Sequence, residues 1–237
     1  MLVIEHLVKS YSAGCRAVDD LSLTVEDGDL YGFIGHNGAG KTTTLRSVAG
    51  ILAFDSGDIL INGKSITREP ILCKQEMAYI PDNPDLYAHL TGIQYLNFTA
   101  DIYGVSAAER EERIRTYGDA FEMTPRLNDL IGSCSHGMKQ KIALIAALLH
   151  KPRLLLLDEP FVGLDPVATH NLKNIMKQMC QEGASIFFST HVLEVAEKLC
   201  NKIAIISEGK LIASGDMEQV KGDSSLEDLF LELTEHA

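Results

Sequence analysis

The stretch GHNGAGKT at residues 35–42 fills every fixed position of the phosphate-binding pattern G-x-x-x-x-G-K-[ST]. The apolar run Leu30–Ile34 before it is typical of a buried strand, and residues 43–52 after it have a helical pattern. Glycines let successive backbone N–H groups curl around a phosphate, and the N-terminus of the following helix adds the positive end of its dipole. The segment therefore predicts a site for a nucleoside triphosphate.

Two side chains of this loop have expected roles in the chemistry. Lys41 is expected to place its ammonium group on the β- and γ-phosphates, and Thr42 to offer its hydroxyl to Mg²⁺, a hard cation that prefers oxygen ligands. The residues expected to contact the nucleotide here are Gly35, His36, Asn37, Gly38, Ala39, Gly40, Lys41, Thr42 and Thr43.

Length and charge limit the possible functions. The 237 residues suffice for one large α/β domain with a sizeable core. The formal net charge of −12 argues against nucleic acid as a partner, because phosphate-backbone binding needs a basic surface. The first residues lack the pattern of an export signal, and no apolar run approaches the roughly 20 residues that span a bilayer. The chain is expected to be soluble and cytoplasmic.

The N-terminal quarter is rich in strand patterns. Residues 2–4 and the alternation at residues 21–25 predict half-buried strands. Residues 58–63 predict another strand that ends in an Asn-Gly turn. Together these segments predict a small β subdomain near the N-terminus.

The character of the chain changes after this region. Thr91 and Ser106 each begin an S/T-x-x-E/Q capping box, and we expect a helical lobe at about residues 86–151. Strand and helix patterns then alternate, which predicts a parallel sheet. In the tail, apolar residues recur from Leu226 to Leu233 with the period of an amphipathic helix.

A pair of acids follows an apolar strand pattern. Four leucines at residues 154–157 precede Asp158, Glu159 and Pro160. Ligands of open parallel sheets bind at the carboxyl edge of the strands, where these acids would lie. Asp158 is expected to hold Mg²⁺, and Glu159 to face the water that attacks the γ-phosphate. The alternative is a strand followed by a solvated acidic turn.

His191 follows a second apolar run, SIFFST at residues 185–190. It would emerge on the same sheet edge as the two acids, where a histidine can hydrogen-bond a γ-phosphate and position water. The alternative is a purely structural histidine. We expect Glu159, His191 and Lys41 to be the catalytic residues.

In order and content these motifs resemble those of the ATP-binding cassette (ABC) ATPases over nearly the whole chain. Residues 35–42 match the Walker A loop, residues 154–159 the Walker B strand, residues 163–165 the D-loop and His191 the switch histidine. SHGMKQK at residues 135–141 is similar to the signature motif, normally written LSGGQ. That motif separates this family from other P-loop proteins.

The resemblance implies a RecA-like P-loop core with a mainly parallel sheet, an N-terminal antiparallel β subdomain and an inserted α-helical lobe. It implies one ABC ATPase domain at residues 1–222 and a C-terminal amphipathic helix or tail at residues 223–237. It also implies a head-to-tail dimer, homomeric or heteromeric, in which Ser135 and Gly137 contact the facing subunit's ATP. Tyr11 matches the aromatic residue that stacks on adenine.

Three residues depart from the family pattern. Asp82 stands where the Q-loop has glutamine, and it remains an expected Mg²⁺ ligand. His136 replaces the first glycine of the signature, where a positive φ would strain the backbone, and Met138 replaces its glutamine.

Residues 80–84, 136–141 and 158–166 resemble the ATPases of ABC-2-type exporters, and the tail at residues 226–234 resembles those of Ecs-type transporters. These likenesses imply a separate integral membrane permease and a place at the inner face of the cell membrane. The expected function is therefore the ATPase subunit of an exporter. A non-transport ABC ATPase acting on the ribosome or on DNA remains the main alternative.

Other classes of P-loop protein fit less well. A GTPase needs N-K-x-D, whereas residues 201–204 read NKIA. An inert regulatory cassette is expected to lack Glu159 or His191, and both are present.

Overall fold

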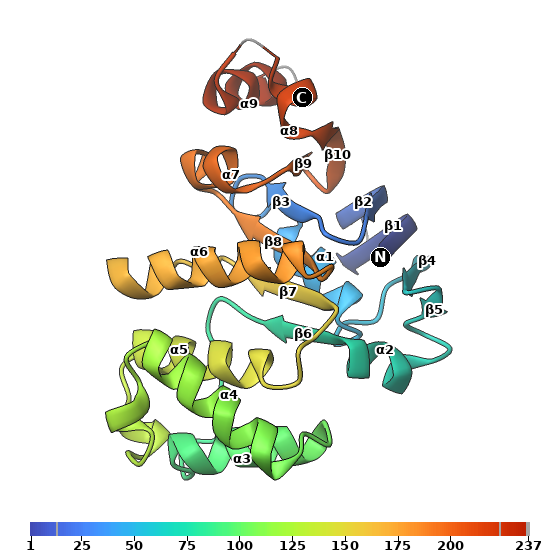
Figure 1. Ribbon diagram of the computed structural model, residues 1–237. Helices are drawn as coiled ribbons and strands as arrows, with labels where there is room; N and C mark the ends of the chain where they lie inside the picture. Colours follow the sequence, from blue (N-terminus) through green and yellow to red (C-terminus); the bar gives the residue numbers. More distant parts are fainter. Residues whose placement is uncertain (13, 223, 236–237) are drawn as a thin grey trace.

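The computed structural model describes residues 1–12, 14–222 and 224–235, so that three residues of the expected tail, 223, 236 and 237, lie outside it. Its centre is a six-stranded sheet in the order β10-β9-β3-β8-β7-β6 (Figure 1). The strands are β3 (Leu30–Ile34), β6 (Met77–Ile80), β7 (Leu154–Asp158), β8 (Ser185–Thr190), β9 (Lys202–Ser207) and β10 (Lys210–Asp216). All neighbouring pairs are parallel except β10 with β9. The predicted mainly parallel sheet is confirmed.

The apolar runs of the central strands divide between two cores. On β7, Leu154 and Leu156 face one core, whereas Leu155 and Leu157 face the other, because successive side chains of a strand point to opposite faces. Helix α1 (Lys41–Val48) contributes to the first core, and α6 (Pro166–Gln181) and α7 (Leu193–Leu199) contribute to the second. A strand covered on both faces needs the continuous apolar sequence that β7 has.

The first core is closed by a separate antiparallel sheet. Its strands are β2 (Cys15–Val25), β1 (Leu2–Ser12), β4 (Ser56–Ile61) and β5 (Lys64–Ser65), in that order. Asn62 and Gly63 join β4 to β5 with φ of 50° and 78°, as the Asn-Gly pair predicts for a two-residue hairpin turn. The expected antiparallel β subdomain is therefore present.

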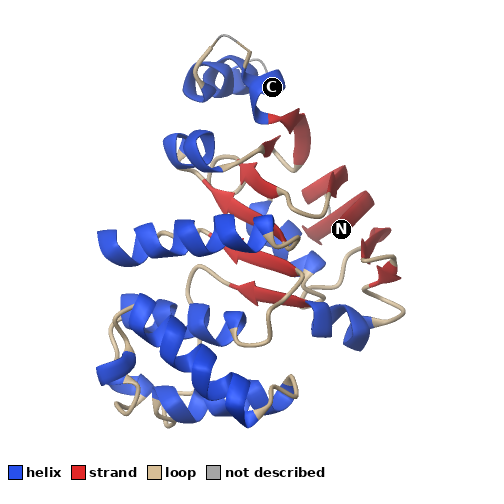
Figure 2. Ribbon diagram, viewed as in Figure 1, coloured by secondary structure: helices blue, strands red, loops and turns tan. Residues whose placement is uncertain are grey.

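A helical lobe packs beside β6, at the end of the sheet (Figure 2). Its helices are α3 (Gly92–Ile102), α4 (Ala107–Ala120) and α5 (His136–Leu148), with 3₁₀ turns at Thr124–Arg126 and Ile131–Ser133. Thr91 caps α3 with a complete capping box. All three helices lie within residues 86–151, between two strands that are neighbours in the sheet.

Three short helices complete the described chain. They are α2 (Pro70–Glu76), α8 (Met217–Lys221) and α9 (Leu226–Glu235). Leu226 and Phe230 on α9 are buried in the second core. The amphipathic tail helix predicted from Leu226 to Leu233 is therefore present and packed against the rest of the protein. Within the described residues, no helix is long and apolar enough to span a bilayer.

One predicted helix has different bounds. The helix expected at residues 43–52 begins at Lys41 and ends at Val48. It begins earlier because Gly40, with φ of 108°, turns the chain directly into the helix. It ends earlier because Gly50 adopts φ of 62°, a left-handed conformation that helices commonly use to terminate.

Candidate functional site

The glycine loop at residues 35–40 joins the carboxyl end of β3 to the N-terminus of α1. Backbone packing explains two of its glycines. A Cβ on Gly35 would lie 2.5 Å from the carbonyl oxygen of Ile206, and one on Gly40 would lie 2.3 Å from that of Ala17. Any side chain at either position would push the loop away from the strands that support it.

Lys41 lies inside this loop and is only 6% exposed. Its ammonium group donates hydrogen bonds to the carbonyl oxygens of Gly35, at 2.5 Å, and His36, at 3.1 Å. Burial lowers the pKa of Lys41, and the neighbouring carboxylates Glu159 and Asp158 oppose that shift. The loop thus holds a buried cation where phosphates are expected.

An oxygen-rich cluster lies beside the lysine. Thr42 Oγ1 donates to Asp158 Oδ2 at 2.7 Å, and Ser189 Oγ donates to Asp158 Oδ1 at 2.5 Å. Asp158 is 1% exposed, and burial raises its pKa, with nearby Asp82 adding to the shift. A buried carboxylate needs hydroxyl donors or a cation to be stable in its charged form. One hydroxyl and two carboxylates are ligands that suit Mg²⁺, so the residues present fit this ion.

Glu159 has a strained backbone and an incompletely satisfied side chain. Its φ is 48°, in the left-handed region that costs a non-glycine residue about 1–3 kcal/mol. Its N–H donates to Ser189 Oγ at 3.0 Å, which helps hold this conformation. Oε1 lies 2.9 Å from Nδ1 of His191 and 3.8 Å from Nζ of Lys41, yet this buried oxygen accepts no hydrogen bond of good geometry. Unpaired buried acceptors of this kind are rare and often mark functional sites.

Lys41, Asp158 and Glu159 line a cavity of about 400 Å³. It is lined by Tyr11, Ala17, His36, Asn37, Gly38, Gly40, Lys41, Thr42, Thr43, Asp82, Asp158 and Glu159. These residues come together because their strands are parallel and end at the same level, with Asp158 paired to Ser189 and Ile34 paired to Thr190. The carboxyl ends of β3, β7 and β8 therefore meet at one edge. At the mouth, Tyr11 is 63% exposed, and its hydroxyl lies 3.3 Å from Thr43 Oγ1.

Two residues of this site, Ser189 and Ala17, belong to none of the sequence motifs described above. The Ser189 hydroxyl donates to the Asp158 carboxylate and accepts from the Glu159 N–H. The only indication of this role in the sequence is a polar residue near the end of the apolar run at residues 185–190. Ala17 presents its carbonyl oxygen to Gly40 from strand β2, and no local pattern indicates that contact.

Ser135 and Gly137 do not line this cavity. They lie at the start of α5, where the Met138 N–H donates to Ser135 Oγ at 3.3 Å and caps the helix. His136 is the first residue of that helix and has no positive φ, so the condition under which this residue would strain the backbone is not met. The helical conformation accepts any L residue.

The start of α5 packs directly on the loop that follows Glu159. The ring of His136 covers Gly163, and a Cβ on Gly137 would lie 2.5 Å from the Gly163 carbonyl oxygen. Lys141 Nζ lies 2.6 Å from Oδ2 of Asp165, whose Oδ1 accepts from the Ala168 N–H and caps α6. These contacts join the signature-like segment to residues 163–165 within one chain.

Replacing Gly137 with Ala is expected to lower ATP turnover by roughly tenfold, because the methyl group would lie 2.5 Å from the Gly163 carbonyl oxygen and displace the loop that follows Glu159. A displacement that raises the barrier by about 1.4 kcal/mol slows the reaction tenfold. The affinity of the isolated subunit for ATP should stay unchanged, since Gly137 does not line the cavity of its own chain. Steady-state turnover and calorimetric affinity test both statements. Gly104→Ala controls for loss of stability alone, because this lobe glycine has φ of 66°, which strains any L residue, but open space around its Cβ position. Equal turnover for Gly137→Ala and the native protein would contradict the prediction.

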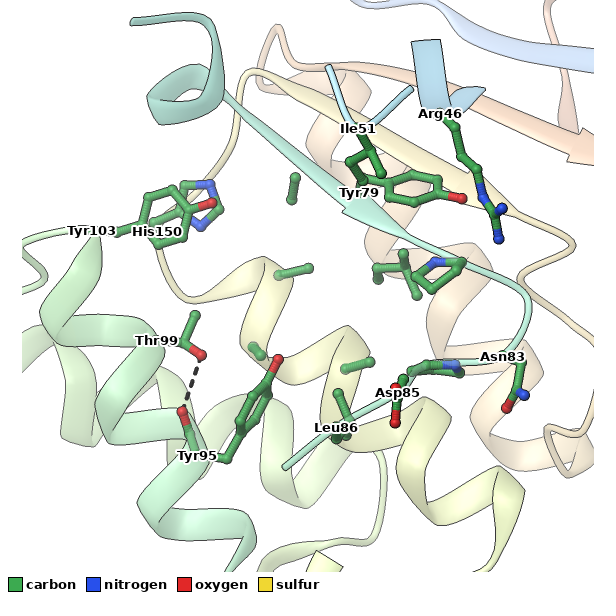
Figure 3. A pocket seen from close by; sticks show the side chains of 17 residues that line it. Arg46, Ile51, Tyr79, Asn83, Asp85, Leu86, Tyr95, Thr99, Tyr103 and His150 are labelled. Carbon is green, nitrogen blue, oxygen red and sulfur yellow. Dashed lines mark hydrogen bonds between the residues drawn. The ribbon is translucent and has the colours of Figure 1, made fainter. Parts of the chain in front are cut away.

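A second cavity, of about 480 Å³, lies between β6 and the helical lobe (Figure 3). The loop after β6 provides Asn83, Asp85 and Leu86, while α3 provides Tyr95 and Thr99. At its far end Tyr103 stacks on His150, with ring centroids 3.7 Å apart and planes at 8°. The cavity is a mainly apolar groove with polar residues at its rim.

His150 makes the stability of the folded protein depend on pH. Burial lowers the pKa of His150 to about 4. The contact of 3.2 Å between its Nε2 and the Met77 carbonyl oxygen acts in the opposite direction and raises the pKa. Positively charged Arg113 also lowers this pKa. As pH falls through 6.5, the unfolded chain binds a proton that the folded chain excludes until about pH 4, so stability is lost across this window.

His150→Phe keeps an aromatic ring but cannot bind a proton. Its Tm is expected to fall less between pH 7 and pH 5 than that of the native protein, although its Tm at pH 7 is lower because the Met77 contact is lost. Thermal unfolding at both pH values measures this, with exposed His89→Gln as control. An equal fall in Tm for the native protein and His150→Phe would disprove the assignment.

The chain is similar to known proteins in both sequence and structure. A family model described as "ABC transporter" matches residues 18–162. The ABC-type transporter ATP-binding protein EcsA of Bacillus subtilis is 36% identical, over 99% of this chain and 96% of that protein. The linearmycin resistance ATP-binding protein LnrL of the same organism is 36% identical, over 91% of this chain and 69% of that protein. A solved structure described as the ATP binding subunit of an ABC transporter superimposes with a TM-score of 0.94 and 36% identity, and the match covers 99% of both chains.

Proposed function

This chain belongs to the ABC transporter family of ATP-binding proteins, and from that membership we propose that it is the ATP-hydrolysing subunit of a membrane transporter. One observation carries the proposal. The Glu159 carboxylate lies beside the phosphate loop, 3.8 Å from Lys41 and 2.9 Å from His191, with a buried oxygen that accepts no well-formed hydrogen bond. A base in that position is suited to take a proton from an attacking water.

The chain's own groups divide the work of hydrolysis. Lys41 leaves the carbonyl oxygens of Gly35 and His36 and binds the β- and γ-phosphates of ATP. Glu159 accepts the proton of the attacking water, and His191 donates a hydrogen bond to the γ-phosphate. Because Lys41 and Glu159 already line the cavity and His191 lies 2.9 Å from Glu159, little rearrangement is needed when charge develops.

Mg²⁺ would be held by Thr42, Asp158 and Asp82, and when bound it would neutralise charge on the phosphates. Tyr11, at the mouth of the cavity, stacks on adenine. Its exposed ring offers the flat surface that this contact needs.

The nucleotide site is completed by a second ATPase subunit. Ser135 and Gly137 lie outside the cavity of their own chain, at the N-terminus of a 13-residue helix whose dipole favours anions. In a head-to-tail dimer they contact the ATP of the facing subunit, which is either a second copy or a related chain. ATP then closes the dimer, and hydrolysis reopens it.

The groove between β6 and the helical lobe is the proposed docking site for the permease. Its apolar floor and the rim residues Asp85 and Asn83 suit a short amphipathic helix from a cytoplasmic loop (Figure 3). The ATPase would thereby be held at the inner face of the membrane. Export is the proposed direction, supported by the relative whose name records linearmycin resistance.

Purification of the tagged protein from native membranes tests this function. The native protein is expected to hydrolyse ATP and to bring down one multispan membrane protein. Leu86→Asp, within the groove, should lose that partner while keeping ATP affinity, whereas Ile71→Asp, at a 72% exposed position outside the groove, should retain it. Consistent recovery of ribosomes instead would favour a non-transport ABC ATPase and overturn the proposal.

A further inference from the structure

The C-terminal helix α9 reaches the phosphate loop. The ring of Phe230 packs against the imidazole of His36, with centroids 4.7 Å apart and an interplanar angle of 62°. Phe230 is 5% exposed, and Leu226, one turn earlier, is fully buried. Both side chains belong to the second core, so the helix is fixed in place where it contacts the loop. Helix α9 lies next to α7 in the fold (Figure 1).

His36 occupies a sensitive position in the loop. Its carbonyl oxygen accepts from the Ala39 N–H at 3.1 Å and from Lys41 Nζ at 3.1 Å. The same backbone group therefore closes the turn of the loop and binds the lysine that is expected to reach the phosphates. A contact that restrains the His36 side chain therefore restrains both the turn of the loop and the position of Lys41.

The loop is supported unevenly by the rest of the protein. Gly35 and Gly40, at its two ends, pack closely against backbone carbonyl groups. Gly38, in the middle, has open space around its Cβ position, and residues 36–38 are exposed. Phe230 contacts the loop in this exposed middle part.

We propose that Phe230 is a positioning residue for nucleotide binding, which acts by holding His36 and through it the shape of the phosphate loop. The proposal rests on the proposed ATP site. Because such coupling is reciprocal, a bound nucleotide must also stabilise α9. The C-terminal helix would then be part of the nucleotide site although it contacts no nucleotide.

The energy of one aromatic contact sets the expected effect. Edge-to-face pairs contribute enough beyond their buried area to change an affinity by roughly two- to tenfold. Phe230→Leu keeps an apolar side chain in the buried position but removes the ring. It is expected to raise Kd and KM for ATP by that factor and to leave kcat unchanged, because Glu159 and His191 are not touched.

A double-mutant cycle isolates the contact. Phe230→Leu in a His36→Ala background should have no further effect on Kd, since the partner ring is already absent. Additive effects of the two substitutions would show that Phe230 acts through general folding, and would overturn the proposal. Tm measurements on each variant verify that the proteins compared are folded.

Hydrogen exchange tests the reciprocal effect. Amides of α9 in the native protein should exchange more slowly with a non-hydrolysable ATP analogue and Mg²⁺ than without them, and His36→Ala should remove the difference. Equal exchange rates of the α9 amides with and without nucleotide would refute the coupling. Failure of the native protein to bind the analogue at all would instead refute the proposed function, so the two failures are distinguishable.

Discussion

Replacing Glu159 with Gln is expected to lower kcat for ATP hydrolysis by at least about a hundredfold, within the range that a positioned general base contributes. The amide has the size of the carboxylate but cannot accept a proton from water at neutral pH. ATP should still bind, because the phosphate loop and Lys41 are unchanged. With turnover blocked, ATP should remain bound and favour a long-lived dimer.

Phosphate release, calorimetry and size-exclusion chromatography with ATP measure these three outcomes. Glu122→Gln is the matched control, because Glu122 also has a positive φ, of 56°, but lies in the helical lobe. It should leave both turnover and oligomeric state unchanged. Hydrolysis by Glu159→Gln at the native rate would remove Glu159 from the mechanism.

Lys41→Ala is expected to weaken ATP binding by on the order of a hundredfold, since each charge-assisted hydrogen bond contributes about 1.5–3 kcal/mol. The lysine is buried and its Nζ lies 3.8 Å from Oε1 of Glu159, so its removal also takes the ammonium group away from that carboxylate. Both effects weaken the site for a highly charged anion.

Isothermal titration calorimetry with Mg-ATP gives the affinity directly, and Tm shows whether the variant is folded. Lys74→Ala provides the control, because Lys74 is exposed and donates to the Gly50 carbonyl oxygen outside the cavity. Native affinity in Lys41→Ala would rule out the loop as the phosphate site.

Local chemistry explains what could be predicted from the sequence. An Asn-Gly pair needs two positive φ values, and four consecutive leucines need cover on both faces, so the hairpin at residues 62–63 and the buried strand β7 were predicted correctly. The acids at the end of β7 and His191 after β8 reach one edge because parallel strands end together. Their catalytic roles stay predictions.

Contacts between distant segments explain what was missed. The Ala17 carbonyl against Gly40 and the Phe230 ring against His36 join residues from different elements, and no periodicity encodes them. The positive φ that would strain His136 is absent for a related reason. The backbone at that position is the first turn of a helix, and its side chain fills space over Gly163.

Strand order also has a consequence for how the protein is made. In the described part of the chain, β3 forms its ladders with β8 and β9, which are synthesised more than a hundred residues later. Until the ribosome has released Ser185–Thr190, the strand that carries the phosphate loop lacks both neighbours. Nascent chains cut short before that point should be unable to use nucleotide as a folding ligand, and are expected to depend on chaperones or be degraded.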